Sequence, residues 1–172
     1  MSWKGPIALF AAWVIHDIEE AFAFPATSDR LVNRTGIKQL RITPHQSWMA
    51  VALMGTLVAA ACGCGVRTSG KSKMYRAVAA GLEAHVASHL IVSIAQRGYT
   101  AGVASALPVM LPGALVARHE LYRDGVSLQF RDTVNGVALL LPAALVCHVV
   151  ARLVRRVPTA TNWPQRQGDR LT

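Results

Sequence analysis

The stretch WVIHDIEEAF (residues 13–22) places four ionisable side chains inside an otherwise apolar segment. His16 and Glu20 are four residues apart, which puts them about 40° apart on one face of a helix. Glu19 lies about 60° to the other side of His16, so the three side chains can converge on one point. Asp17 stands at the edge of this arc. Imidazole and carboxylate groups on one helical face are typical ligands of a divalent metal ion.

A pair of histidines occurs in a later apolar segment, in the stretch EAHVASHL. His85 and His89 have the spacing that lets two imidazoles of one helix bind the same metal ion, as in HExxH helices. His148 lies in a third apolar segment. A hydrogen bond to a backbone carbonyl or a hydroxyl group explains this histidine as well as metal binding does, so both interpretations stay open.

Other polar groups are expected to lie outside this site. Glu83 lies about 160° around the helix from His85 but only about 20° from Arg76, so we expect Glu83 to pair with that arginine. The remaining groups fall near the ends of apolar segments, where solvent is expected to reach them: His45, His119, Glu120 and Asn135.

The composition indicates a small membrane protein with one domain. Of the 172 residues, 52% are hydrophobic and only 16% are charged, which is too apolar for most soluble proteins. The formal net charge is +9, but the basic residues form short runs between apolar segments. Such runs are typical of contacts with lipid headgroups. Nucleic-acid binding is therefore not expected, and membrane lipids are the expected partners.

The apolar segments predict an all-α polytopic bundle of about five transmembrane helices, since one span needs about 20 residues. We expect the first segment to end at Pro25, and the fourth to be kinked or shortened by Pro108 and Pro112. Residues 1–156 would form the transmembrane domain and residues 157–172 a polar, disordered tail. The five segments are about 5–24, 47–66, 75–96, 99–118 and 133–154.

The polar clusters are predicted to meet at one depth. The first, third and fifth spans run parallel, and His16 and His85 each lie about 16 Å from the start of their span. His148 lies at a similar depth. Because no lysine or arginine falls in the middle of a span, a divalent metal would neutralise the glutamates. Purely structural ion pairing is the alternative.

The stretches HDIEE, HVASH and RGYTAGVASALPVMLPGAL together resemble the HXXEE family of small integral-membrane proteins. The resemblance extends from about Ile7 to Arg155. It implies a polytopic helical membrane protein, and the family has no agreed reaction. It also implies that the functional positions are those that match its motifs: His16, Glu19, Glu20, His85, His89 and His148. Glu83 and His119 are not among them.

The expected metal ligands are these six residues: His16, Glu19, Glu20, His85, His89 and His148. Six ligands exceed the four of a closed zinc site, and bridging carboxylates suit two ions. Iron is favoured, with zinc or manganese as alternatives. Glu19 and Glu20 are the expected catalytic residues.

The leading hypothesis is an integral-membrane oxidoreductase that acts on a lipid-like or amphipathic small molecule. One alternative is a zinc-dependent intramembrane hydrolase, in which Glu20 or Glu19 activates water as general base. The other is a non-catalytic metal-binding membrane protein. The sequence gives neither the orientation in the membrane nor the oligomeric state.

Overall fold

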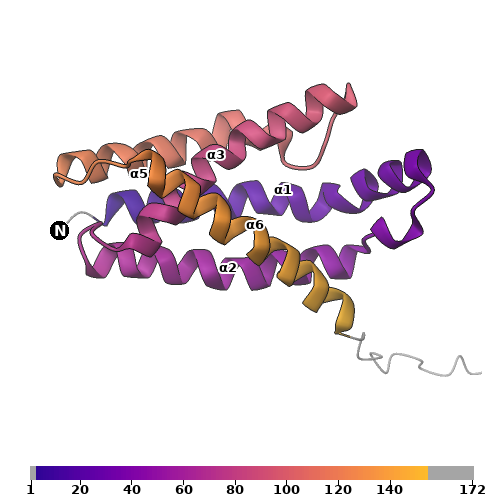
Figure 1. Ribbon diagram of the computed structural model, residues 1–172, viewed down its shortest axis with the longest axis horizontal. Helices are drawn as coiled ribbons and strands as arrows, with labels where there is room; N and C mark the ends of the chain where they lie inside the picture. Colours follow the sequence, from indigo (N-terminus) through magenta and orange to yellow (C-terminus); the bar gives the residue numbers. More distant parts are fainter. Residues whose placement is uncertain (1–2, 155–172) are drawn as a thin grey trace, which may run out of the picture.

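The computed structural model describes residues 3–154, and this part of the chain folds as a bundle of helices without strands (Figure 1). The all-helical prediction is therefore confirmed. The predicted tail, residues 157–172, lies outside the described residues. The long helices are α1 (Lys4–Thr35), α2 (Pro44–Arg67), α3 (Lys73–Gln96), α5 (Leu111–Arg123) and α6 (Phe130–Leu153). The short elements are a 3-10 turn (Lys38–Leu40), α4 (Val103–Ser105) and a π-helical turn (Ala106–Met110).

Helices α2, α3 and α6 are long and apolar enough to cross a membrane. The five predicted spans are thus matched by three such helices in the described part of the chain. Helix α5 has only 13 residues, and α1 carries Asp17, Glu19 and Glu20 in its apolar stretch. The short length of α5 and the charged residues of α1 therefore explain why these two predicted spans are not among the three helices.

The distribution of side chains is consistent with a membrane protein. On α6, Leu141 and Leu145 are 61% and 62% exposed, whereas His16, Asp17 and His89 are buried inside the bundle. Lipid accepts an apolar outer surface, and it forces ionisable groups toward the protein interior. These ionisable groups are thus enclosed by the bundle, while the leucines of α6 face outward.

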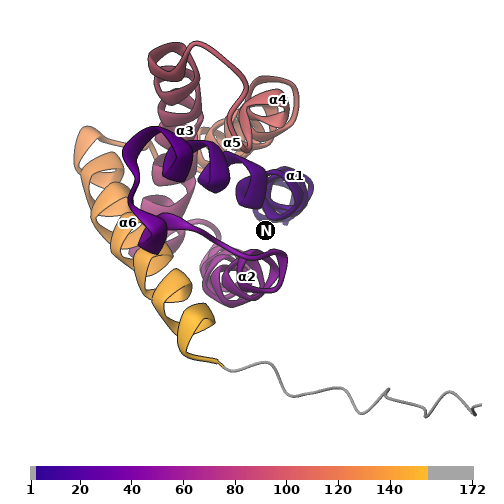
Figure 2. The ribbon, with the colours of Figure 1, turned by 90° about the vertical axis from the view of Figure 1, so that its right-hand side faces the viewer.

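Helix α1 continues through Pro25 to Thr35, so the prediction that this segment ends at Pro25 is wrong. A proline removes one backbone donor and bends a helix, but it does not have to end it. In Figure 2 the last turns of α1 swing away from the axis of its first part. The helix ends at Gly36, whose left-handed conformation (φ 74°) lets its N–H donate to the Val32 carbonyl oxygen at 2.8 Å.

The fourth predicted segment is broken into pieces, as its two prolines suggested. A loop after α3 leads into α4, which passes directly into the π-helical turn that contains Pro108. Pro112 then stands in the first turn of α5. π-Helical turns are frequent at functional sites because they displace side chains from regular helical positions. Here the irregular stretch comes immediately after Ser105.

Helices α3 and α6 approach each other through glycines. A Cβ atom on Gly136 would lie 2.1 Å from the Ala77 carbonyl oxygen and 2.7 Å from the Gly81 Cα atom. Only hydrogen fits in that space, so the two backbones can touch, as is common between membrane helices.

Two ion pairs join α3 to its neighbours, and they correct one prediction. Arg76 pairs with Asp132 of α6 at 3.4 Å, and Glu83 pairs with Arg118 of α5 at 2.7 Å. The predicted Arg76–Glu83 pair is therefore wrong. Both side chains instead find partners on other helices, which spacing along α3 alone does not reveal.

We predict that the two ends of the described chain lie on opposite sides of the membrane. The start of α1 and the end of α6 lie at opposite ends of the bundle (Figure 1). Topology reporters fused before Lys4 and after Val154 should report opposite compartments in intact cells. Reports from the same compartment would contradict an odd number of crossings.

Candidate metal centre

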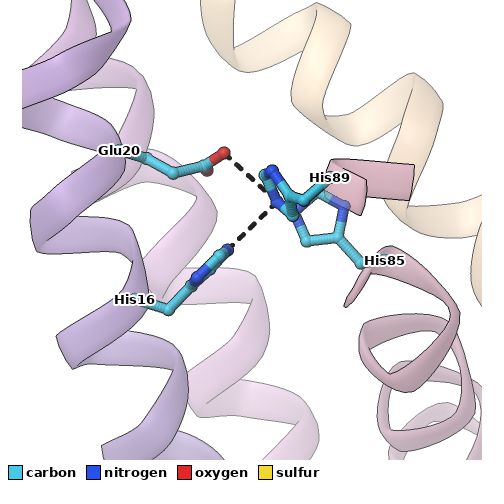
Figure 3. Close-up of side chains that lie close together, drawn as sticks. All are labelled: His16, Glu20, His85 and His89. Carbon is cyan, nitrogen blue, oxygen red and sulfur yellow. Dashed lines mark hydrogen bonds and ion pairs between the residues drawn. The ribbon is translucent and has the colours of Figure 1, made fainter. Parts of the chain in front are cut away.

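Four side chains from α1 and α3 meet in the interior of the bundle (Figure 3). One donor atom from each of His16, Glu20, His85 and His89 lies within 4.8 Å of the others. The Nε2 atom of His89 is 3.1 Å from Nε2 of His16 and 2.8 Å from Nε2 of His85. The Glu20 Oε1 atom is 3.5 Å from the same His89 nitrogen. The prediction that the two polar clusters meet is confirmed.

The outer nitrogen of His89 fixes the protonation of its ring. His89 Nδ1 lies 2.9 Å from the Ala101 carbonyl oxygen. A carbonyl oxygen can only accept, so Nδ1 must carry the hydrogen. In a neutral imidazole the other nitrogen, Nε2, then offers a lone pair.

The same logic holds for His16. Its Nδ1 atom lies 2.9 Å from the Ser105 Oγ atom. The Ser105 hydroxyl donates its one hydrogen to the Glu19 carboxylate, so Ser105 Oγ must accept from His16 Nδ1. The Nε2 atom of His16 therefore also points inward with a lone pair.

His85 is held in a similar way by a serine of its own helix. The Ser88 hydroxyl donates to the His85 carbonyl oxygen at 2.7 Å, and its Oγ atom is 3.3 Å from His85 Nδ1. With its hydrogen used there, Ser88 Oγ can accept from His85 Nδ1–H. In that tautomer of His85 the third Nε2 lone pair also faces the centre.

With these tautomers, three nitrogen lone pairs face one another. A single added proton would join only one pair of these nitrogens, whereas one divalent metal ion can bind all three. Three imidazole nitrogens and a carboxylate oxygen form a donor set that suits zinc, iron or manganese. Hydrogen bonds at the outer nitrogens are the usual way to orient metal-binding histidines. The residues present therefore fit a metal centre.

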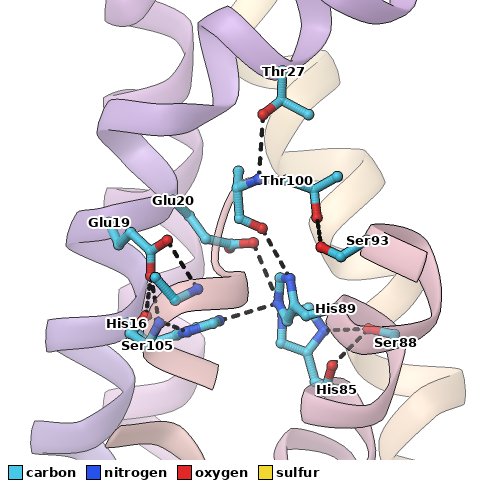
Figure 4. A network of polar contacts seen from close by, with 12 residues as sticks. His16, Glu19, Glu20, Thr27, His85, Ser88, His89, Ser93, Thr100 and Ser105 are labelled. Carbon is cyan, nitrogen blue, oxygen red and sulfur yellow. Dashed lines mark hydrogen bonds and ion pairs between the residues drawn. The ribbon is translucent and has the colours of Figure 1, made fainter. Parts of the chain in front are cut away.

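Glu19 lies next to this group but turns to the loop after α3 (Figure 4). Its carboxylate accepts hydrogen bonds from the Tyr99 hydroxyl at 2.5 Å and from the backbone N–H groups of Ala104 and Ser105 at 3.3 and 2.8 Å. It also accepts from the Ser105 hydroxyl. Metal binding by Glu19 stays a prediction, and it would require these contacts to break.

His148 also lies outside the group of four. Its ring stacks on Phe24 with 5.2 Å between the ring centroids, and it lines the same cavity as Glu20 and His85. Its role as a ligand stays a prediction. Glu83 and His119 are not members of the group, and Asn135 is exposed.

The loop between α3 and α4 contributes groups that the sequence pattern did not single out. Ala101 offers its carbonyl oxygen to His89, and the Ala101 N–H donates to Thr27 Oγ1 at 3.2 Å. Gly102 has a left-handed backbone (φ 83°), and a Cβ there would lie 2.5 Å from His89 Cε1 and 2.9 Å from His16 Cε1. The glycine in the stretch TAG was the one local signal for such a close approach.

A family model described as "Protein of unknown function with HXXEE motif" matches residues 7–117. This match covers more than half of the chain, so the protein belongs to the HXXEE family. It includes the whole group of four and the loop at residues 97–105, whereas His148 lies outside it. No match was found among curated proteins or among solved structures.

We predict that Gly102→Ala weakens metal binding by at least about tenfold, the scale found when groups that orient metal ligands are lost. The new methyl group would press on both His16 and His89 in a backbone conformation that alanine disfavours. Metal content after dialysis against a graded chelator measures the effect. Gly98→Ala is the matched control, because a Cβ there meets only the Gln96 carbonyl oxygen at 3.9 Å. Equal metal retention in both variants would contradict the prediction.

Proposed function

We propose that this member of the HXXEE family is a membrane metalloenzyme that binds a divalent ion between His16, His85 and His89. The observation that carries the proposal is the convergence of three Nε2 atoms whose outer nitrogens already use the ring hydrogen. Glu20 supplies a negative charge beside them. The group is enclosed by the bundle, and intramembrane ionisable groups usually mark function.

The proposal commits to one ion. Four donor atoms from three imidazoles and a carboxylate are enough for one metal ion. A second ion, as the sequence predicted, would need further ligands such as Glu19, which accepts four hydrogen bonds from the loop and Ser105. The two-ion arrangement stays a prediction, and metal stoichiometry decides between the two.

For the reaction we propose an oxidoreductase that acts on an amphipathic molecule. A bound iron ion would supply redox chemistry, and four protein donors leave positions open in a six-coordinate site. The chain's own contribution is to hold the imidazoles in one tautomer and to surround them with apolar helices. We also propose that α1 crosses the membrane, and that the stretch ending in α5 does so too.

A zinc-dependent hydrolase is the second candidate, and the position of Glu20 favours it. The Glu20 Oε1 atom lies 3.5 Å from the nearest histidine nitrogen, farther than the imidazole nitrogens lie from His89 Nε2. Three histidines and a water molecule complete a catalytic zinc site. Glu20 would then stay free as a general base for that water.

We predict that His16→Ala and His89→Ala each lower bound metal by at least about tenfold, because each removes an inward-facing donor. The measurement is metal content per chain in gently purified protein. Glu83→Ala and His119→Ala serve as controls, since one side chain pairs with Arg118 and the other is exposed. Similar metal content in all four variants would overturn the site.

We predict that protein purified without oxygen contains about one iron per chain, since four donors form one site. On admission of air, the iron should change from ferrous to ferric, which Mössbauer spectroscopy detects. A magnetically coupled pair of irons would favour the two-ion arrangement. One zinc per chain, unchanged by air, would favour the hydrolase. Protein that binds no divalent metal would contradict both.

A further inference from the structure

A cavity of about 320 Å³ lies between α1, α2, α3 and α6. Its volume falls within the range of small-molecule sites, about 300–1,000 Å³. Most of its wall is apolar and comes from all four helices, including Trp13, Val51, Met54, Leu82, Leu140 and Leu141. On α1 alone, the lining residues run from Trp13 to Phe24, which corresponds to about 16 Å of helix. The cavity is therefore long enough for an alkyl chain.

One part of the wall is polar and belongs to the candidate metal centre. Glu20 and His85 line the cavity together with Ser88 and Asp17. A molecule in the cavity would thus lie against two members of the metal-binding group. No lysine or arginine is among the described lining residues.

Asp17 is the group in this wall that lacks a partner. Its side chain is buried, with 5% of the residue exposed. Its Oδ2 atom has no hydrogen-bond partner among the described residues. A buried polar atom without a partner is costly, and a ligand that offers a hydrogen-bond donor would remove that cost.

We propose that this cavity binds a single-chain amphipathic alcohol or amine, with the chain along the apolar wall and the donor group at Asp17. The proposal rests on the proposed function, because it names the substrate class of the same site. Alcohols and amines can donate to Asp17, whereas a carboxylate head would meet Asp17 and Glu20 without a lysine or arginine to pair with. Asp17 is thus a specificity-determining residue.

Photolabelling tests this binding separately from metal binding. The probes are three decyl chains that carry a diazirine and end in an amine, an alcohol or a carboxylate. Chelator-treated, metal-free protein in lipid nanodiscs is labelled, and mass spectrometry locates the modified residues. We expect the amine and the alcohol to modify cavity residues such as Met54 and Leu140, and an excess of unlabelled decylamine to compete. Labelling confined to the exposed outer face of α6 would mean bilayer partition only and would overturn the proposal.

Two neighbouring substitutions on α6 give a matched test of the site. Ala144 lines the cavity and Ala143 does not. Ala144→Phe should lower cavity labelling by at least about tenfold, as expected when a ligand pocket is filled, whereas Ala143→Phe should leave it unchanged. Equal labelling in the two variants would overturn the cavity as the binding site. The positions labelled in the unsubstituted protein remain a test if Ala144→Phe fails to fold.

A third variant tests the role of Asp17. The amine probe should label the unsubstituted protein about tenfold more than the carboxylate probe, and Asp17→Asn should remove that preference. A preference that survives Asp17→Asn would overturn the assignment of Asp17. If the probes label the cavity but the protein binds no metal in the separate measurements, the proposed metalloenzyme is refuted. The proposal that the cavity binds an amphipathic molecule is then still supported.

Discussion

The candidate metal centre depends on three imidazole nitrogens that face one another with their lone pairs directed inward. Such an arrangement is unfavourable unless a cation lies between them, because each Nε2 atom presents electron density to its neighbours. In this structure the Nδ1 atom of each histidine contacts an oxygen outside the group. The partners of His16, His85 and His89 are Ser105, Ser88 and Ala101 in that order. The outer contacts thus favour tautomers whose inward lone pairs are the donors that the proposed metal ion would bind.

The two glutamates that follow each other in α1 act in different places. Glu20 lies with the imidazoles, while Glu19 holds the loop at residues 97–105 through Tyr99 and Ser105. Consecutive residues of a helix point about 100° apart, so one pair of glutamates can serve both purposes. Ser105 connects Glu19 to the imidazoles, since its hydroxyl donates to Glu19 and accepts from His16. The carboxylate that was expected to bridge metals thus acts in this structure through the group that orients a histidine.

Helical spacing and depth were enough to predict that His16, Glu20, His85 and His89 come together, because both clusters lie at the same distance from the start of parallel helices. Features set by other helices were not predictable in this way. Glu83 pairs with Arg118 of α5 instead of Arg76. Glu19 accepts hydrogen bonds from Tyr99 in the loop and from Ala104 and Ser105 of α4. The continuation of α1 through Pro25 was also missed, since a proline limits local hydrogen bonding but does not decide where a helix ends.

A charged group in the middle of a membrane helix costs about 2.5–3.5 kcal/mol on insertion scales, so the cluster has to be offset by something. Arg76 and Arg118, which lie on α3 and α5, pair with Asp132 and Glu83 rather than with Glu20. Neither arginine is therefore placed to neutralise Glu20. In the described part of the chain, the ionisable groups near Glu20 include the imidazoles of the group of four and the carboxylates of Asp17 and Glu19. In the proposed arrangement, a cation bound between the imidazoles would balance Glu20, and a donor in the adjoining cavity would satisfy Asp17. A metal ion and an amphipathic molecule would then lie side by side.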